Sequence, residues 1–162
     1  MKDIKQELGF IYIDDKGNKF LNESDIKQDN IVGFTCSCFD LLHAGHILML
    51  KDAKEQCDYL IVGLQTDPTI DRPKIKNKPI QSLVERKLQI EAVKYVDEVI
   101  IYDTEKDLYN LIYNIKPDVR IIGSDYKGKY FTGYELCSNI YYHDRNHNFS
   151  TSNLRNLIKM EG

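Results

Sequence analysis

The sequence predicts an α/β fold built on a doubly wound parallel sheet, with helices on both faces. From residue 31 onward, short apolar runs of strand length alternate with segments in which apolar residues recur at helical spacing. The strand-like runs are short and mainly apolar, as in strands that are covered on both faces. Helices that alternate with such strands are typical of parallel sheets.

The predicted elements follow one another along the chain in a regular order. Apolar runs predict strands, the last of them weaker, at 31–35, 59–64, 99–102, 119–123 and 139–143. Helical spacing predicts a first helix that opens at the two histidines, His43 and His46, and continues through Ala53, and further helices at 82–94, 105–114 and 151–159. Because parallel sheets bind their ligands at the carboxyl ends of the strands, the functional residues are expected in the loops that follow these strands.

Residues 1–30 are predicted to form an extension that is separate from a domain at residues 31–162. Apolar and polar residues alternate on either side of a turn signal between residues 10 and 21, which predicts a small β-hairpin. A partly disordered leader is the alternative for this extension.

Length and composition indicate one globular domain. A chain of 162 residues with 42% hydrophobic and 29% charged residues can bury a core unaided. The net charge of −3 gives no reason to expect a nucleic-acid partner. No apolar run approaches the roughly 20 residues that cross a bilayer, and the first residues lack the apolar stretch of a signal peptide. We therefore expect a cytoplasmic protein that binds neither nucleic acid nor membrane.

The four cysteines of the sequence fit a reducing compartment as free thiols. Cys36 and Cys38 lie at the end of the first predicted strand, close to His43 and His46, so a metal site is one interpretation. Zinc sites usually show wider cysteine spacings, such as C-x-x-C. Packing at the strand end is therefore the better explanation of Cys36.

The most informative segment contains two histidines, His43 and His46, at the predicted first turn of a helix that follows a strand. They lie on one face, beside backbone N–H groups that have no partner within the helix. These donors, the positive end of the helix dipole and two imidazoles are together suited to bind phosphate. Gly45 between them lets a ligand approach the backbone closely.

Four ordered motifs resemble those of the cytidylyltransferase-like nucleotidyltransferases, the HxGH family. They are residues 38–46, Glu85–Lys87 with 94–99, residues 123–129, and Arg145 with 149–152. The set is most similar to glycerol-3-phosphate cytidylyltransferase, and its first motif is also similar to heptose-phosphate adenylyltransferases. The resemblance implies a Rossmann-like fold, with residues 31–162 as the nucleotidyltransferase domain.

The resemblance implies that an acceptor attacks the α-phosphorus of a nucleoside triphosphate in line. It implies catalytic roles for His43, His46, Lys74 and Arg145. It implies nucleotide binding by Cys38, Phe39, Asp40, Gly45, Asp125, Ser150, Thr151 and Ser152. Mg²⁺ is the expected cofactor, held mainly by the triphosphate, with no direct metal ligand assigned. Asp40 either orients its loop, helps to hold Mg²⁺ through water, or forms the turn.

The loop at residues 71–78 carries four cations within residues 72–78. Its position between a strand and a helix suggests a basic lid over the phosphates, and a solvated surface is the alternative. Lysines of this loop contact phosphates in the cytidylyltransferases, which implies that role for Lys74 and, at the acceptor phosphate, for Lys76. Arg86, in the next helix, is expected to contact the acceptor phosphate or a dimer partner; an ordinary surface arginine is the alternative.

Arg145 and the three residues 150–152 form a second predicted phosphate clamp. Ser and Thr directly before an apolar run are N-cap signals, and a helix N-terminus with free hydroxyls also binds anions. Capping alone explains the serines, but it does not explain an arginine at the offset found in the family. Residues 146–149 depart from the family, with Asn-His-Asn-Phe where the cytidylyltransferases usually have Thr-x-Gly-Ile.

The resemblance favours a CTP-dependent cytidylyltransferase that couples CMP to a small phosphorylated alcohol, with glycerol 3-phosphate as the best match. The products are pyrophosphate and a CDP-alcohol for a cell-surface polymer or capsule. The alternative is an adenylyltransferase for a sugar 1-phosphate of the heptose type, which Arg145 disfavours because those enzymes tend to have an acidic residue there. An inactive nucleotide-binding regulator is disfavoured by the intact phosphate motifs. Residues 95–99 resemble a subunit interface, so a homodimer is expected.

Overall fold

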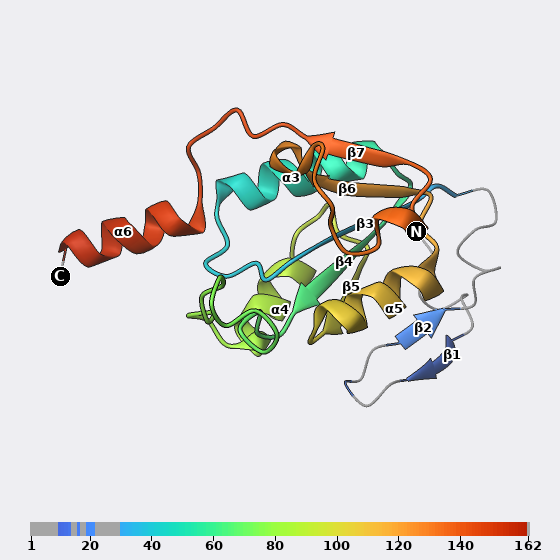
Figure 1. Cartoon of the computed structure of the whole chain (residues 1–162), viewed down its shortest axis with the longest axis horizontal. Helices are drawn as coiled ribbons and strands as arrows, with labels where there is room; N and C mark the ends of the chain where they lie inside the picture. Colours follow the sequence, from blue (N-terminus) through green and yellow to red (C-terminus); the bar gives the residue numbers. More distant parts are fainter. Residues whose placement is uncertain (1–9, 14–15, 17–18, 22–29, 162) are drawn as a thin grey trace.

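The computed structural model describes residues 10–13, 16, 19–21 and 30–161. Its centre is a five-stranded sheet with the strand order β5-β4-β3-β6-β7, in which every neighbouring pair is parallel (Figure 1). The strands are β3 Val32–Ser37, β4 Tyr59–Gln65, β5 Glu98–Tyr102, β6 Val119–Gly123 and β7 Ile140–His143. From β3 the chain winds outward to β4 and β5, then returns to build β6 and β7 on the other side. This confirms the predicted doubly wound parallel sheet.

Helices cover both faces of the sheet, as predicted. They are α3 Ala44–Glu55, α4 Leu83–Glu91, α5 Glu105–Ile115 and α6 Thr151–Glu161. Two short 3₁₀ helices, Ser124–Tyr126 and Tyr134–Leu136, lie between β6 and β7. On one face, α3 and α4 pack with the sheet around the buried Leu50, Leu60, Val62, Ile90 and Ile121. On the other face, α5 packs around Phe34, Ile100, Leu108, Ile112 and Cys137.

Local sequence fixes where the helices begin and end. α4 and α5 both start at a capping box, in which the side chains of Ser82 and Thr104 accept the backbone N–H three residues later. α4 ends at Glu91, three residues before the predicted end. The chain leaves the helix there because Tyr95 and Val96 pack against the core cluster under α3 and α4 instead of continuing the turn.

The last helix, α6, projects from the domain in Figure 1, and none of its residues is buried. It is held near its start by Asp40, which lies in the loop between β3 and α3. The hydroxyl of Thr151 donates to the carbonyl of Asp40 at 3.1 Å, and the guanidinium of Arg155 donates to its carboxylate at 2.8 Å. The start of α6 is therefore fixed next to the start of α3.

In the N-terminal extension, β1 Phe10–Ile13 and β2 Lys19–Leu21 pair as antiparallel strands. The rest of the extension, including most of the expected hairpin turn, lies outside the described residues, so the hairpin as a whole stays a prediction. Within the described residues, no helix combines the length and apolar character that a membrane crossing requires.

Candidate active site

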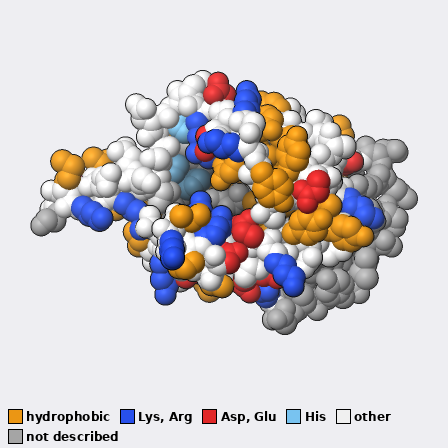
Figure 2. All heavy atoms as spheres, viewed as in Figure 1, with side chains coloured by type: hydrophobic (Ala, Val, Ile, Leu, Met, Phe, Trp, Pro, Cys, Tyr) orange, Lys and Arg blue, Asp and Glu red, His pale blue; other side chains and the backbone are white. Residues whose placement is uncertain are grey.

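One cavity of about 720 Å³ lies at the carboxyl ends of the strands, within the usual range of small-molecule sites, roughly 300–1,000 Å³. The last residue of every strand of the five-stranded sheet lines it: Ser37, Gln65, Tyr102, Gly123 and His143. So do all four histidines of the sequence: His43, His46, His143 and His147. Figure 2 shows the hollow, with histidine side chains coloured pale blue in its wall.

His43 and His46 cap the start of α3 with their side chains. Nδ1 of His43 accepts the backbone N–H of Gly45 at 3.0 Å, and Nδ1 of His46 accepts the backbone N–H of His43 at 3.3 Å. The two rings stack, with centroids 3.8 Å apart and planes 24° apart. Because each Nδ1 is an acceptor, a neutral ring carries its proton on Nε2. Each histidine therefore keeps one ring N–H donor for a ligand.

The site keeps both rings uncharged at neutral pH. Burial lowers the pKa of His46 to about 3, and the charges of His43 and Arg145 act in the same direction. Burial, His147 and Arg145 also lower the pKa of His43. His43 and His46 therefore offer neutral donors, and positive charge in the cavity comes from the arginines and Lys76.

Two glycines make room for side chains in the cavity wall. A Cβ atom on Gly45 would lie 2.8 Å from the ring of His147 and 2.9 Å from the ring of His43. A Cβ atom on Gly123 would lie 3.0 Å from a guanidinium nitrogen of Arg145. Because neither position has a side chain, the rings of His43 and His147 can lie against the backbone at Gly45, and the guanidinium of Arg145 can lie against the backbone at Gly123. The close approach of a ligand to the backbone at Gly45 stays a prediction.

Asp40 orients the loop before the histidines. Its carboxylate accepts the backbone N–H groups of Ile80 and Gln81, each at 2.9 Å, in addition to Arg155. Burial by itself raises the pKa of Asp40, but these two hydrogen bonds and Arg155 lower it below its ordinary value. The carboxylate does not line the cavity. Of the alternatives for Asp40, orientation of the loop fits this placement directly. Turn formation and a water-mediated role toward Mg²⁺ stay predictions.

The segment before α6 brings the predicted clamp to the cavity. Arg145 and Asp125 face each other, with Nη1 and Oδ1 3.8 Å apart, and both side chains are more than half exposed. Ser150 accepts the backbone N–H of Asn153 at 3.0 Å, as an N-cap does. Ser150, Thr151 and Ser152 all line the cavity. Arg145 takes no part in the cap, so capping does not explain it.

Arg86 corrects the sequence prediction. It is 2% exposed, so it is not a surface arginine, and it does not line the cavity. Its guanidinium donates to the backbone carbonyls of Gln81, Cys38, Gln65 and Thr66 at 2.6–3.1 Å. These carbonyls lie at the ends of β3 and β4 and before α4. Arg86 therefore joins three loops, and an acceptor phosphate would have to displace those bonds to reach it.

Some of the other predicted site residues line the cavity, and others do not. Those that line it are Cys38, Gly45, Lys76 and Asp125, in addition to the histidine pair and the clamp. Phe39 is fully buried beneath His46, with ring centroids 5.3 Å apart, and belongs to the core. Lys74 is exposed and does not line the cavity, because the loop turns at residues 72–76 and brings Lys76 there instead.

Several cavity residues are not predicted individually from the sequence, although Arg72 belongs to the predicted basic loop. Arg72 pairs with Glu105 at 2.7 Å, and Thr132 donates a hydrogen bond to Glu105. His143 shares a hydrogen bond of 2.6 Å with Asp52 of α3. Arg120 is a charged residue within the apolar strand β6, and that anomaly was the available signal. Among the described residues, no group of three or more His, Cys, Asp or Glu side chains is arranged to hold a metal ion.

The profile of the family described as Cytidylyltransferase-like matches residues 34–156, which include the cavity wall and all of the sheet except the first two residues of β3. The chain therefore belongs to the cytidylyltransferase-like nucleotidyltransferases.

Named relatives give a narrower comparison. The chain is 39% identical over 133 residues to the bifunctional protein HldE of Campylobacter jejuni strain 81116, which is 82% of this chain and 29% of the relative. It is 42% identical over 135 residues to HldE of Helicobacter hepaticus, and the match covers 83% of this chain and 28% of the relative. The chain thus spans under a third of these curated relatives. Among solved structures, the fold is similar to the crystal structure of a lipopolysaccharide core biosynthesis protein from Thermoplasma volcanium GSS1, with a TM-score of 0.58 and 28% sequence identity. The superposition covers 75% of this chain and 99% of that protein's chain.

The lowered pKa of His46 predicts an acid-dependent loss of stability. In the unfolded chain His46 takes up a proton near its ordinary pKa of 6.5, whereas in the folded chain it does so only at about 3. The unfolded state binds more protons in this window, so stability is full above pH 6.5 and falls as the pH is lowered. His46→Gln keeps an acceptor for the capping box but cannot titrate.

Between pH 6.5 and 5.5 the free energy of unfolding should fall by about 1 kcal/mol more in the wild type than in His46→Gln. Urea unfolding at each pH measures the difference. Parallel pH dependences for the two proteins would show that His46 is not held neutral.

Proposed function

We propose that this protein is an adenylyltransferase that moves AMP from ATP onto a sugar phosphate of the heptose type. An oxygen of the acceptor phosphate forms a bond to the α-phosphorus, the bond to the β-phosphate breaks, and pyrophosphate leaves. The observation that carries nucleotidyl transfer is the stacked pair His43 and His46, whose Nε2 donors serve one cavity at the strand ends. The choice of ATP and a sugar phosphate is supported by the HldE and lipopolysaccharide core relatives.

In the proposed reaction, the chain positions the reactants and offsets negative charge. His43 and His46 donate from Nε2 to oxygens of the α- and β-phosphates, beside the positive end of the α3 dipole. Arg145 and the start of α6 bind the outer phosphates, where the guanidinium offers a planar fork. Lys76 reaches the phosphates from the loop before α4. Both histidines are neutral, and a neutral imidazole does not give up its N–H proton to a phosphate. They therefore stabilise the transition state as hydrogen-bond donors and not as acids.

Mg²⁺ and a homodimer remain parts of the proposal. The carboxylates that line the cavity, Asp125 and Glu105, already face Arg145 and Arg72. Mg²⁺ would therefore be held by triphosphate oxygens, where it neutralises charge.

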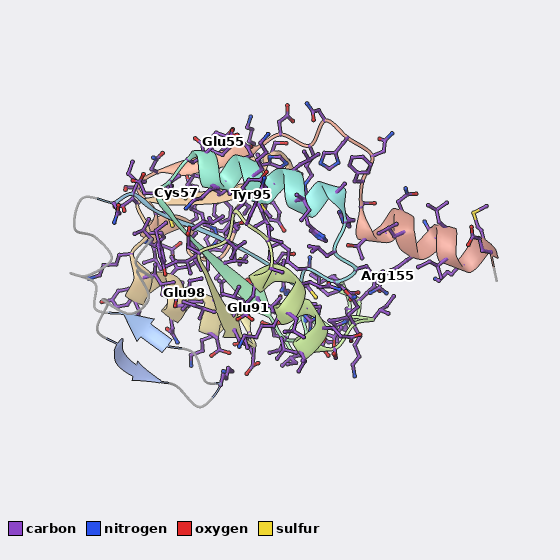
Figure 3. The ribbon with its side chains drawn as sticks, turned by 180° about the vertical axis from the view of Figure 1, so that it is seen from behind. Glu55, Cys57, Glu91, Tyr95, Glu98 and Arg155 are labelled. Atoms are coloured by element: carbon purple, nitrogen blue, oxygen red, sulfur yellow. The ribbon has the colours of Figure 1, made fainter. Side chains whose placement is uncertain are left out.

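The expected interface, residues 95–99, lies beyond the end of α4, with Tyr95 and Glu98 labelled in Figure 3. Val84 and Leu88 of α4 are exposed apolar side chains that a second copy could cover.

The second candidate is the CTP-dependent cytidylyltransferase for a small phosphorylated alcohol, glycerol 3-phosphate in particular. Arg145 favours it, because it stands at the offset of the cytidylyltransferase signature and lines the cavity. Both candidates use the same phosphate chemistry, so they differ in the base and in the acceptor.

Substrate profiling tests the choice between the two candidates. Pyrophosphate release should be measured with ATP or CTP against mannose 1-phosphate, heptose 1-phosphates and glycerol 3-phosphate. We expect kcat/KM for ATP with its best sugar phosphate to exceed that for CTP with glycerol 3-phosphate by at least about tenfold, a free-energy difference near 1.4 kcal/mol. The reverse order would establish the second candidate.

His43→Asn tests the role of the histidine pair. The amide oxygen of Asn can still accept the N–H of Gly45, so the helix cap is retained. The Nε2–H donor of the imidazole, which faces the ligand, is lost. We expect kcat to fall by roughly 10²-fold or more, as for one preorganised donor to developing charge, with little change in Tm. Lys87→Gln on the outer side of α4 is the control. Near wild-type turnover in His43→Asn would refute the proposed mechanism.

A further inference from the structure

Arg120 is a charged side chain in the otherwise apolar strand β6, and it is 3% exposed. In the sheet it stands beside Phe34 of β3. Its guanidinium carbon lies 5.0 Å from the ring centre of Phe34 and 5.9 Å from that of Phe131. The two rings hold the planar group and shield it from water, and the side chain still lines the cavity.

The guanidinium of Arg120 lacks the partners that a buried structural arginine has. Among the described residues, Nη2 has one hydrogen-bond partner, the sulfur of Cys36, a weak acceptor, at 3.2 Å. Nε and Nη1 have no hydrogen-bond partner within the described part of the chain. Arg86 is equally buried, yet its guanidinium reaches four backbone carbonyls. Arg120 is therefore a buried cation whose charge is not compensated by the described residues, which is an unfavourable state without a bound anion.

A polar network lies next to Arg120, on the side of the cavity formed by β4 and β5. Thr132, adjacent to Phe131, donates to the carboxylate of Glu105 at the start of α5. Arg72 pairs with the same carboxylate at 2.7 Å and donates to Gln65 at 2.8 Å. Carboxylate, amide and hydroxyl groups of this kind bind the hydroxyls of sugars and polyols. The clamp, in contrast, lies in the segment after β7 and at the start of α6.

We propose that Arg120 binds the phosphate of the acceptor, with the hydroxyls of the acceptor on the Glu105 network. This inference rests on the proposed function, since it requires that one cavity hold two anionic substrates. The donors at the starts of α3 and α6 serve the nucleotide phosphates. A second phosphate needs a cation of its own, and Arg120 supplies it in place of Arg86.

Stability separates this role from a structural one. Methionine fills a similar volume between Phe34 and Phe131 and removes the charge. If Arg120 awaits an anion, Arg120→Met raises the Tm of the ligand-free protein, because an uncompensated buried charge is lost. If Arg120 stabilises the fold, the same change lowers the Tm.

Calorimetry tests the binding itself. The nucleotide subsite is first saturated with α,β-methylene-ATP, which cannot react at the α-phosphorus, and inorganic phosphate or mannose 1-phosphate is then titrated. We expect Arg120→Met to weaken binding of both probes by roughly 30-fold, as for loss of hydrogen bonds from a charged group. The affinity for the analogue should change less than about threefold. Lys127→Met, on an exposed residue outside the cavity wall, should match the wild type.

The outcomes are decisive for Arg120. An unchanged affinity for the probes in Arg120→Met, a lowered Tm of that variant, or no uptake of either probe by the wild type would overturn the assignment. If the wild type binds phosphate through Arg120 but does not turn over ATP, the proposed function fails and the anion site stands. If ATP is turned over and Arg120→Met keeps the acceptor KM, the anion site alone fails.

Discussion

The site depends on one local interaction: the two imidazoles at the start of α3 accept backbone N–H groups through Nδ1. Those N–H groups would otherwise be unpaired at a helix N-terminus. Satisfying them with ring nitrogens fixes the orientation of both rings and puts the proton of each on Nε2. Capping and ligand binding are thus not competing roles for His43 and His46, because each uses a different nitrogen of the ring.

A second constraint is that the loops around the histidines come from distant parts of the sequence. Asp40 connects the loop before α3 to residues 80–81 and to α6. Arg86 connects the ends of β3 and β4 to the residue before Ser82. Phe39 and Leu41 adopt left-handed backbone conformations, with φ of 48° and 51°, which cost about 1–2 kcal/mol each. The hydrogen bonds of Asp40 and the burial of Phe39 hold this loop in place.

The fold and the phosphate motifs were predictable because their signals are local. Apolar runs and helical spacing gave the order of the elements, and His43, Gly45 and His46 form one short motif before a helix. Arg145 and Ser150–Ser152 likewise lie within eight residues of one another, and the structure brings them to the same cavity.

The remaining errors concern side chains whose partners are remote. Arg86 was assigned to a phosphate because nothing nearby in sequence shows that carbonyls of three loops would surround it. Lys74 and Lys76 are two residues apart, and only the turn of the loop decides which one reaches the cavity. The sequence pattern assigns Arg120 to a strand and no more, since its role depends on its burial and on the few hydrogen bonds it makes to the described residues. The exposure of such groups cannot be read from periodicity.

The central claim is that backbone capping and burial hold both rings of the HxGH motif neutral with the proton on Nε2. Imidazole ¹⁵N correlation spectra of the protein between pH 7 and 5 test it directly, with His43→Asn and His46→Gln to assign the signals. We predict an unprotonated Nδ1 and a protonated Nε2 for both residues at pH 7, and no titration of His46 above pH 5 because its pKa is about 3. His143 serves as an internal reference, since its Nδ1 faces the carboxylate of Asp52 and should carry a proton. A protonated Nδ1 on His43 or His46 at pH 7, or a titration of His46 near pH 6.5, would contradict the account.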